Sequence, residues 1–170
     1  MPHILIVEDE PSTSWALAEG LTEDGFTTDT FRTGEEAIAW LRNGTSDLVI
    51  ASLRLPGMSG LDLARKLRRG PHAQPVIIVT ADGTPQVLRD LERAGVAHCF
   101  PKPFPLDGLR RSVRQAIESA SRRRTRLTTR ANGAARGNGA SAGRTAPAVR
   151  MIGSLRVRTV SRGEGRLERP

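Results

Sequence analysis

The stretch Val76-Ile-Ile-Val-Thr80 is a short, continuous apolar run of a kind that recurs along this 170-residue chain. Two more such runs are His3–Val7 and Asp47–Ala51. Continuous apolar runs of this length are typical of strands that are buried on both faces of a parallel sheet. Val96–Phe100 predicts a further strand. The run Phe26–Phe31 is more polar, so we expect it to form an edge strand.

Longer amphipathic stretches, with apolar residues three and four positions apart, lie between and after these runs. Helices are expected over residues 12–24, from Thr33 to about Gly44, from Ser59 to Gly70, over about 84–94, and from about 106 into the 120s. The second stretch begins Thr33-Gly-Glu-Glu36, which has the spacing of a capping box. Strict alternation of strands and helices predicts an α/β fold. We expect a doubly wound, five-stranded parallel sheet with helices on both faces.

Polar side chains follow several of the predicted strands at their carboxyl ends, the edge at which such sheets bind ligands. They are Glu8, Asp9, Glu10, Ser52, Thr80 and Lys102. Adjacent carboxylates suit a hard cation such as Mg²⁺. A threonine hydroxyl and a lysine ammonium suit an anionic oxygen, as in a phosphoryl or carboxylate group. The simpler alternative is that the acids only solvate a loop and pair with the lysine.

Four segments of the chain resemble the response-regulator receiver domain of two-component signalling, and together they extend over about residues 2–120. The segments are Ile4–Glu10, Asp47–Gly60, Val76–Ala81 and Phe100–Phe104. The resemblance implies a flavodoxin-like (βα)5 receiver fold. Each segment alone is a weak signal, whereas all four in this order and at these spacings are a strong one.

The resemblance also implies roles for individual residues. Glu8 and Asp9 would hold Mg²⁺ weakly, with the backbone carbonyl of Arg54 as a further ligand. Thr80 and Lys102 would bind the phosphoryl oxygens, and the peptide bond from Lys102 to Pro103 would be cis.

Position 52 departs from the family pattern. Counted back from Pro56 and from Gly60, it is the place where the family has the aspartate that accepts the phosphoryl group, and here it is Ser52. A serine hydroxyl cannot form an acyl phosphate, and no base is evident to activate it. A live site that uses Ser52 is the less favoured alternative. Since one carboxylate is missing, Lys102 is expected to turn toward Glu8 or Asp9, and Mg²⁺ binding is expected to be weak.

A second departure is Cys99, which stands three residues before Lys102 at the position of the family's aromatic switch residue. Cysteine is too small for that role. We expect a buried apolar filler, with a redox sensor as the less favoured alternative. The Trp15 and Trp40 side chains are expected to pack against aliphatic neighbours. The three histidines are dispersed, which argues against a metal role for them.

The net charge of +8 comes entirely from the end of the chain. Residues 1–120 carry 13 basic and 16 acidic side chains, whereas residues 121–170 carry 13 and 2. We therefore predict a receiver-like domain at 1–120 and an Arg/Ala/Gly-rich flexible linker at 121–150. The tail at 151–170 is a candidate for the beginning of a truncated output domain. Any affinity for DNA is expected to come from the basic tail, and in particular from Arg122–Arg126.

Composition excludes several other classes of protein. Aromatic residues make up 4 % of the chain and tyrosine is absent, which argues against a stacking platform for single-stranded nucleic acid. A single cysteine excludes an internal disulfide framework and a cysteine-based zinc site. The amino-terminal residues lack a cationic leader, and no apolar run is long enough to span a bilayer. A cytoplasmic protein without a membrane segment is expected.

Three hypotheses from different classes follow. In the first, the protein is an atypical receiver of phosphorelay signalling, not an enzyme, that binds a sensor histidine kinase or another signalling protein. It could form a homodimer through the face made by the fourth helix, fifth strand and fifth helix, where Arg110, Arg111 and Arg114 are either a solvated surface or an interaction edge. If these arginines form an interaction edge, Ala97 and His98 stand at the positions of the acidic residues that would complement them in the family. The second hypothesis is a DNA-binding transcriptional response regulator whose output domain is truncated or absent. The third, a small phosphotransfer or Mg²⁺-dependent enzyme, is disfavoured by Ser52.

Overall fold

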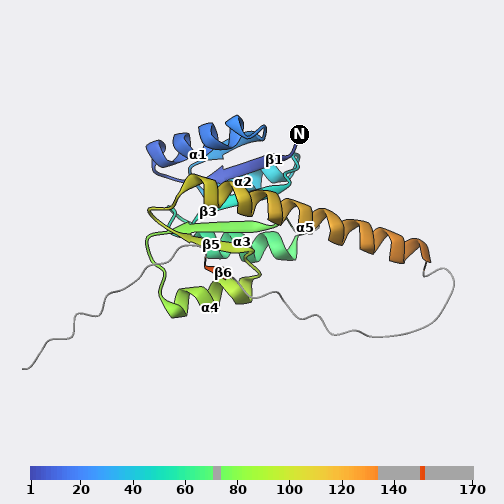
Figure 1. Cartoon of the computed structure of the whole chain (residues 1–170). Coiled ribbons are helices and arrows are strands. Elements are labelled where there is room, and N and C mark those ends of the chain that lie inside the picture. Colours follow the sequence, from blue (N-terminus) through green and yellow to red (C-terminus); the bar gives the residue numbers. More distant parts are fainter. Residues whose placement is uncertain (71–73, 134–149, 152–170) are drawn as a thin grey trace, which may run out of the picture.

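The computed structural model of the protein describes residues 1–70, 74–133 and 150–151, with side chains described up to residue 126 (Figure 1). The strands are β1 (His3–Val7), β2 (Thr27–Phe31), β3 (Leu48–Ser52), β4 (Val76–Thr80), β5 (His98–Pro101) and the two-residue β6 (Arg150–Met151). The helices are α1 (Pro11–Glu23), α2 (Gly34–Leu41), α3 (Gly60–Arg69), α4 (Pro85–Ala94) and α5 (Leu106–Gly133). Strands and helices alternate from β1 to α5, as the sequence predicts.

All strand pairs are parallel, and the strand order is β2-β1-β3-β4-β5-β6. The prediction of a doubly wound, five-stranded parallel sheet is confirmed, with the short β6 added at one edge. Every residue of β3 and β4 is buried, whereas no residue of β2 is fully buried. The polar strand therefore lies at the edge, as expected from its composition.

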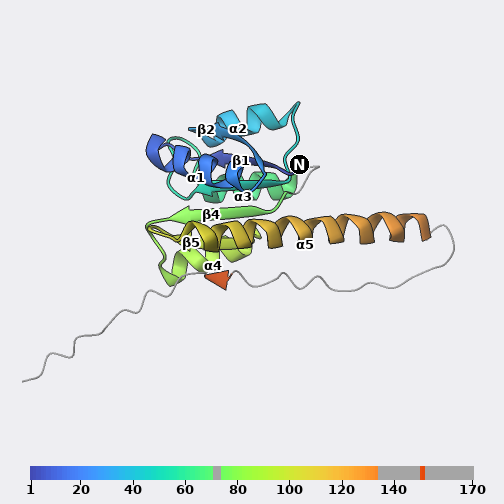
Figure 2. The same cartoon turned by 45° about the horizontal axis from the view of Figure 1, so that its top comes forward.

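Helices cover both faces of the sheet, and each face has its own hydrophobic core (Figure 2). One core packs α1 and α5 against the sheet through side chains such as Leu21 and Val113. The other packs α2, α3 and α4 through side chains such as Leu63 and Leu91. Alternate residues of each central strand serve the two cores, because successive side chains of a strand point to opposite faces.

The amino terminus of α2 shows how closely local sequence fixes a helix boundary. The Thr33 hydroxyl accepts from the Glu36 amide at 3.2 Å, and the Glu36 carboxylate accepts from the Thr33 amide at 3.2 Å. The predicted capping box is therefore present. The predicted cap of α3 is present too, since the Ser59 hydroxyl accepts from the Asp62 amide at 3.2 Å.

The carboxyl-terminal part of the chain differs from its prediction in two places. The flexible linker was expected to start at residue 121, but α5 continues to Gly133 and projects beyond the body of the domain (Figure 1). Residues 121–132 contain no glycine or proline and are rich in arginine, a good helix former, which is a physical reason for the continuation. Arg150 and Met151, expected at the end of the linker and the start of the tail, pair with β5. The rest of the predicted linker and tail lies outside the described residues.

None of the helices among the described residues combines the length and hydrophobicity that a bilayer span requires.

Candidate functional site

The polar residues singled out by the sequence lie at the carboxyl edge of the sheet. Glu8 directly follows β1, Ser52 is the last residue of β3, Thr80 is the last residue of β4, and Lys102 directly follows β5. These strands are neighbours in the sheet, and Ser52 is in register with Val79 of β4. The parallel topology therefore brings side chains from four separate segments to one edge.

Glu8 and Lys102 form the closest contact at this edge. The Lys102 Nζ atom donates to Glu8 Oε2 at 2.6 Å, and the exposed fractions of the two side chains are 26 % and 2 %. The second oxygen, Glu8 Oε1, accepts from the Glu10 amide at 3.3 Å. The expectation that Lys102 turns toward one of the acids is confirmed, and Glu8 is the acid that it binds.

Ser52 and Thr80 present buried hydroxyl groups rather than charges. Their exposed fractions are 6 % and 3 %. The Thr80 hydroxyl accepts from the Asp82 amide at 3.0 Å, which orders the start of the loop after β4. The Lys102 amide donates to the Thr80 carbonyl at 2.7 Å, and the Lys102–Pro103 peptide bond is cis, as the resemblance implies.

The third acid of the amino-terminal loop does not belong to this group. The Ser12 hydroxyl donates to Glu10 Oε1 at 2.6 Å, and the Thr13 amide donates to Glu10 Oε2 at 2.7 Å. These hydrogen bonds lower the pKa of the Glu10 carboxyl from 4.5 to about 2. Glu10 is therefore the N-cap of α1, and its oxygens are already in use.

The sequence matches the response regulator receiver domain family over residues 4–114. The chain belongs to this family.

Several regulators are similar to this receiver domain in sequence. The DNA-binding transcriptional regulator NtrC of Salmonella typhimurium is 29% identical over 158 residues, covering 93% of this chain and 34% of the relative. The transcriptional regulatory protein TcrA of Mycobacterium tuberculosis is 39% identical over 108 residues, covering 63% of this chain and 42% of the relative. This chain thus spans between a third and a half of the length of these relatives.

Solved structures show the same fold. The receiver domain of a putative LuxO repressor from Vibrio parahaemolyticus superposes with a TM-score of 0.69 at 27% identity, covering 73% of this chain and 95% of that one. A CheY-like receiver domain from Methanospirillum hungatei superposes with a TM-score of 0.69 at 21% identity, covering 72% of this chain and 98% of that one.

The donor set of this receiver domain fits a dedicated Mg²⁺ site poorly. Position 52 contributes a hydroxyl, and the Glu8 carboxylate is already neutralised by Lys102. Among residues 1–70, 74–133 and 150–151, no group of three or more acidic, histidine or cysteine side chains is placed to hold a metal ion. Asp9 is half-buried and its carboxylate is the one left next to this pair.

Sequence analysis missed Asp82, which bridges two loops at the carboxyl edge. Arg54 NH2 lies 3.7 Å from Asp82 Oδ2, with exposed fractions of 84 % and 33 %. Asp82 Oδ1 also accepts from the Thr84 amide at 3.3 Å. The sequence signal that could have identified Asp82 is its position two residues after Thr80, next to the carboxyl end of a predicted strand. An exposed ion pair of this kind contributes little stability. It does connect the loop after β3, which carries Arg54, to the loop after β4, which carries Asp82.

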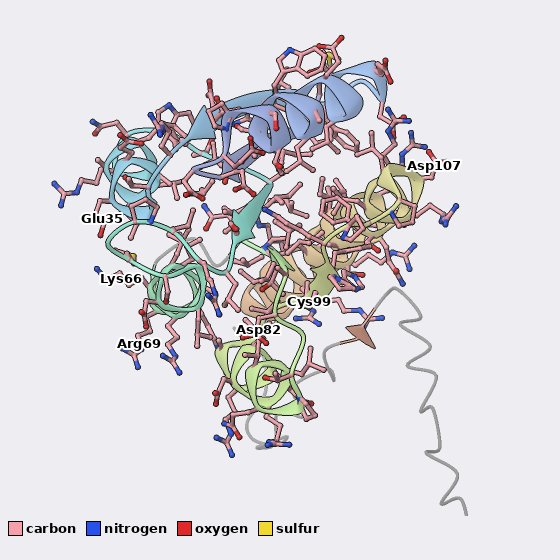
Figure 3. All side chains as sticks on the ribbon, turned by 90° about the vertical axis from the view of Figure 1, so that its left-hand side faces the viewer. Glu35, Lys66, Arg69, Asp82, Cys99 and Asp107 are labelled. Carbon is pink, nitrogen blue, oxygen red and sulfur yellow. The ribbon has the colours of Figure 1, made fainter. Side chains whose placement is uncertain are left out.

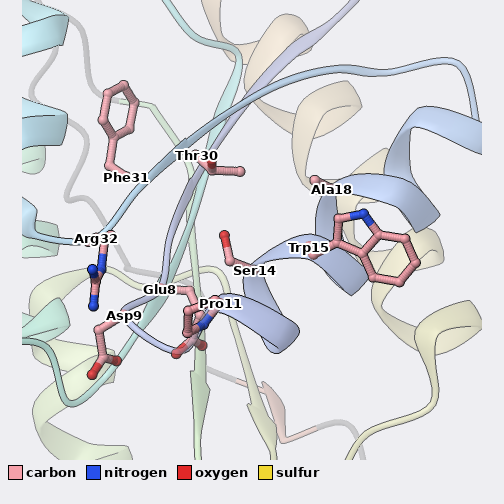
Figure 4. Close-up of a pocket in the computed structure, with 9 residues that line it drawn as sticks. All are labelled: Glu8, Asp9, Pro11, Ser14, Trp15, Ala18, Thr30, Phe31 and Arg32. Carbon is pink, nitrogen blue, oxygen red and sulfur yellow. The ribbon is translucent and has the colours of Figure 1, made fainter.

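A cavity of about 330 Å³ lies beside the acidic pair, between the ends of β1 and β2 and the start of α1 (Figure 4). Trp15 lines its rim and is 66 % exposed, so the prediction that Trp15 is packed among aliphatic neighbours is wrong. The prediction holds for Trp40, which packs against the mostly aliphatic core on the side of α2, α3 and α4. Trp15 lies on the face of α1 opposite the buried residues Leu17 and Leu21, so its side chain points to solvent.

Cys99 is completely buried in the core under α3 and α4 (Figure 3). Burial raises the pKa of its thiol from 9.0 to about 11. A protonated thiol is a poor nucleophile, so these properties favour the apolar filler over the redox sensor.

The arginines of α5 divide between two surroundings. Arg110 donates to the Gly20 carbonyl at 2.9 Å and to Glu23 at 2.7 Å, and Arg114 NH2 lies 3.0 Å from Asp24. Both arginines therefore tie α5 to the carboxyl end of α1. Arg110 is 21 % exposed, so neither expected alternative describes it, whereas Arg114 is 58 % exposed and fits the expected solvated surface. Arg111 is exposed and remains compatible with both.

Proposed function

We propose that this receiver domain is an atypical receiver, not an enzyme, that transmits signals through protein–protein contacts instead of an aspartyl phosphate. The observation that carries the proposal is the residue at position 52. Ser52 ends β3 with a buried hydroxyl at the place where the family carries its phosphate-accepting carboxylate.

The chemistry of the surrounding residues supports this proposal. Phosphorylation of a serine needs a base that removes the hydroxyl proton. The nearby carboxylates of the amino-terminal loop have other partners, since Glu8 accepts from Lys102 and Glu10 accepts from Ser12 and Thr13. The Lys102 Nζ atom is hydrogen bonded to Glu8 rather than to Ser52. The ion pair also occupies the two charged groups that would otherwise meet a metal ion and a phosphoryl oxygen.

The partner that fits this proposal is a sensor histidine kinase or another signalling protein in the cytoplasm. Binding of Mg²⁺ would be weak, with Asp9 and the backbone carbonyl of Arg54 as its main ligands. The association between this receiver domain and its protein partner would then be controlled by the partner, not by phosphorylation at this edge of the sheet.

The direct test is phosphoryl uptake from a small-molecule phosphoryl donor in the presence of Mg²⁺. We expect wild type and Ser52→Asn to gain no mass, whereas Ser52→Asp gains one acid-labile phosphoryl group in intact-mass analysis. Ser52→Asn is the matched control because it has the size of aspartate without its charge. A phosphoryl group on Ser52 of the wild-type protein would overturn the proposal.

A second candidate function, DNA binding, is favoured by two observations. Relatives such as NtrC are named DNA-binding regulators, and α5 carries Arg122, Arg123 and Arg126 on an exposed, projecting helix (Figure 2). Counterion release makes such binding fall steeply with salt.

Duplex binding by the full chain, followed by fluorescence anisotropy over a salt series, tests this candidate. Replacing the three α5 arginines by glutamine is expected to abolish the salt-dependent affinity. The matched control replaces three exposed arginines elsewhere, Arg42, Arg65 and Arg89. Equal losses in both triple variants would indicate a general effect of net charge.

A further inference from the structure

The outer edge of β5 is occupied by another part of the same chain. Arg150 and Met151 form β6, which runs parallel to β5 with His98 opposite Arg150 and Cys99 opposite Met151. Figures 1 and 2 show β6 beside β5 on the side of α4, far from the projecting end of α5. Without β6, β5 would be the edge strand of the sheet.

We propose that the edge of β5 is a binding site for an extended peptide strand and that its occupant is the chain's own segment at Arg150–Met151. An edge strand presents a row of backbone donors and acceptors that another strand can pair with. The proposal does not depend on the residue at position 52, and therefore stands apart from the proposed signalling role.

The backbone geometry of β5 identifies the groups that form the site. The Lys102 amide donates to the Thr80 carbonyl of β4 at 2.7 Å, and His98 and Phe100 are in register with Ile77 and Val79. Backbone groups of successive strand residues point alternately to the two neighbouring strands. His98 and Phe100 therefore face β4, as Lys102 does, and the amide and carbonyl of Cys99 face β6. Pro101, which has no amide, ends the row.

The sequence around the occupant suits an added strand. Arg150 and Met151 stand between Val149 and Ile152, two β-branched residues that favour strands. A cationic residue within an edge strand also discourages further strands from adding to it. The segment is thus able to pair with β5 and to close the sheet at that side.

Occupation of this edge restricts what else can bind there. A second copy of the chain, or an extended segment of a partner, can pair with β5 only after Arg150 and Met151 have left. The homodimer proposed on the face of α4, β5 and α5 would then have to use the helices alone or displace β6. The carboxyl-terminal segment is an intramolecular competitor for that face.

Cysteine cross-linking in the full chain tests the register, because Cys99 is the only native thiol. Paired strands lie about 4.8 Å apart, within the range of about 4.4–6.8 Å between Cα atoms that a disulfide spans. Met151→Cys should form an intramolecular disulfide with Cys99 when the unfolded chain is refolded in the presence of oxidised glutathione, because the Cys99 thiol is accessible only before the core closes. Arg150→Cys is the matched control, since a thiol one position away is expected on the opposite face of the sheet.

Each outcome of the cross-linking decides the proposal. Selective intramolecular cross-linking of Met151→Cys supports it. A covalent dimer would show that the segment of another copy occupies the edge, which overturns the intramolecular assignment. Absence of a cross-link, or equal cross-linking of both variants, would overturn the register and with it the site.

Hydrogen exchange gives a second measurement that does not depend on thiol reactivity. Arg150→Pro removes the backbone amide of β6 that faces β5 in this register, so exchange at the Cys99 amide should increase on the order of tenfold. The amide of Leu5 in the central strand β1 is the internal control and should not change. A wild-type exchange rate at the Cys99 amide in the variant would overturn the proposal.

Discussion

Replacing Lys102 by methionine is expected to destabilise the protein by leaving a buried carboxylate without its partner. Glu8 is 2 % exposed and accepts from Lys102 at 2.6 Å. The other hydrogen bond to Glu8 comes from the Glu10 amide at 3.3 Å. It is long, and its donor is uncharged. A methionine has nearly the length of lysine, so the substitution removes the charge and largely keeps the volume.

The size of the effect follows from the geometry of the pair. Two unit charges 2.6 Å apart attract by about 6 kcal/mol at an effective dielectric constant of about 20. Much of this attraction offsets the cost of burying Glu8. Removing one partner of a buried pair costs about 3–5 kcal/mol. Lys102 is 26 % exposed, so water reaches this site and we expect a loss near the lower limit, about 3 kcal/mol.

Urea and thermal unfolding of four proteins measure this effect: wild type, Lys102→Met, Glu8→Gln and the double variant. The single Lys102→Met substitution should lower the melting temperature by roughly 6–12 °C, since 1 kcal/mol corresponds to about 2–4 °C at this chain length. The double variant should recover about half of the loss, because a neutral amide needs no counter-charge.

Two results would contradict this reasoning. A loss below about 0.5 kcal/mol for Lys102→Met, the range of ordinary surface substitutions, would show that Lys102 does not neutralise Glu8. Strict additivity of the two single substitutions would show that the side chains do not interact in the folded protein.

Three further predictions concern other residues. Ser52→Asp should bind Mg²⁺ more tightly than wild type in calorimetric titration and melt at a lower temperature without the metal, because clustered carboxylates repel; identical titrations would mean that position 52 does not face the acids. Thr33→Ala should cost about 1 kcal/mol in urea unfolding through loss of the helix cap, while an unchanged midpoint would exclude a stabilising capping box. Cys99 should react with iodoacetamide at pH 8 only after unfolding. Since burial raises the pKa of this thiol from 9.0 to about 11, the folded form holds its proton more tightly, and its contribution to stability should be lost as the pH rises from about 9 to 11.

Local sequence patterns were sufficient to predict the strands, the helix cap at Thr33 and the residues at the carboxyl edge of the sheet. The three continuous apolar runs became the central strands β1, β3 and β4, and the polar run became the edge strand β2. The Thr33 capping box formed at the predicted residues. The residues at the carboxyl edge could be predicted because the ends of neighbouring parallel strands meet at one edge of the sheet. This arrangement does not depend on the conformation of the connecting loops.

Some of the errors concern contacts between segments that are distant in the sequence. The pairing of Met151 with β5 joins residues about fifty positions apart, and a two-residue strand has no periodicity that a sequence could show. The hydrogen bonds from Arg110 to the end of α1 likewise depend on how two helices pack. Trp15 was misplaced because its spacing from Ala18 fits an apolar helix face, whereas the face of α1 that reaches the core carries Leu17 and Leu21.

The contact between Gly60 and Ser52 has a consequence for how such domains change over time. The Gly60 amide donates to the Leu53 carbonyl at 3.0 Å, and a Cβ atom on Gly60 would meet the Ser52 carbonyl oxygen. The loop is thus held by main-chain atoms of residues 52 and 53, not by the side chain at position 52. Serine and aspartate can therefore replace each other there without moving the loop. A single substitution at position 52 can therefore change the charge at this edge of the sheet while the main chain that holds the loop stays in place.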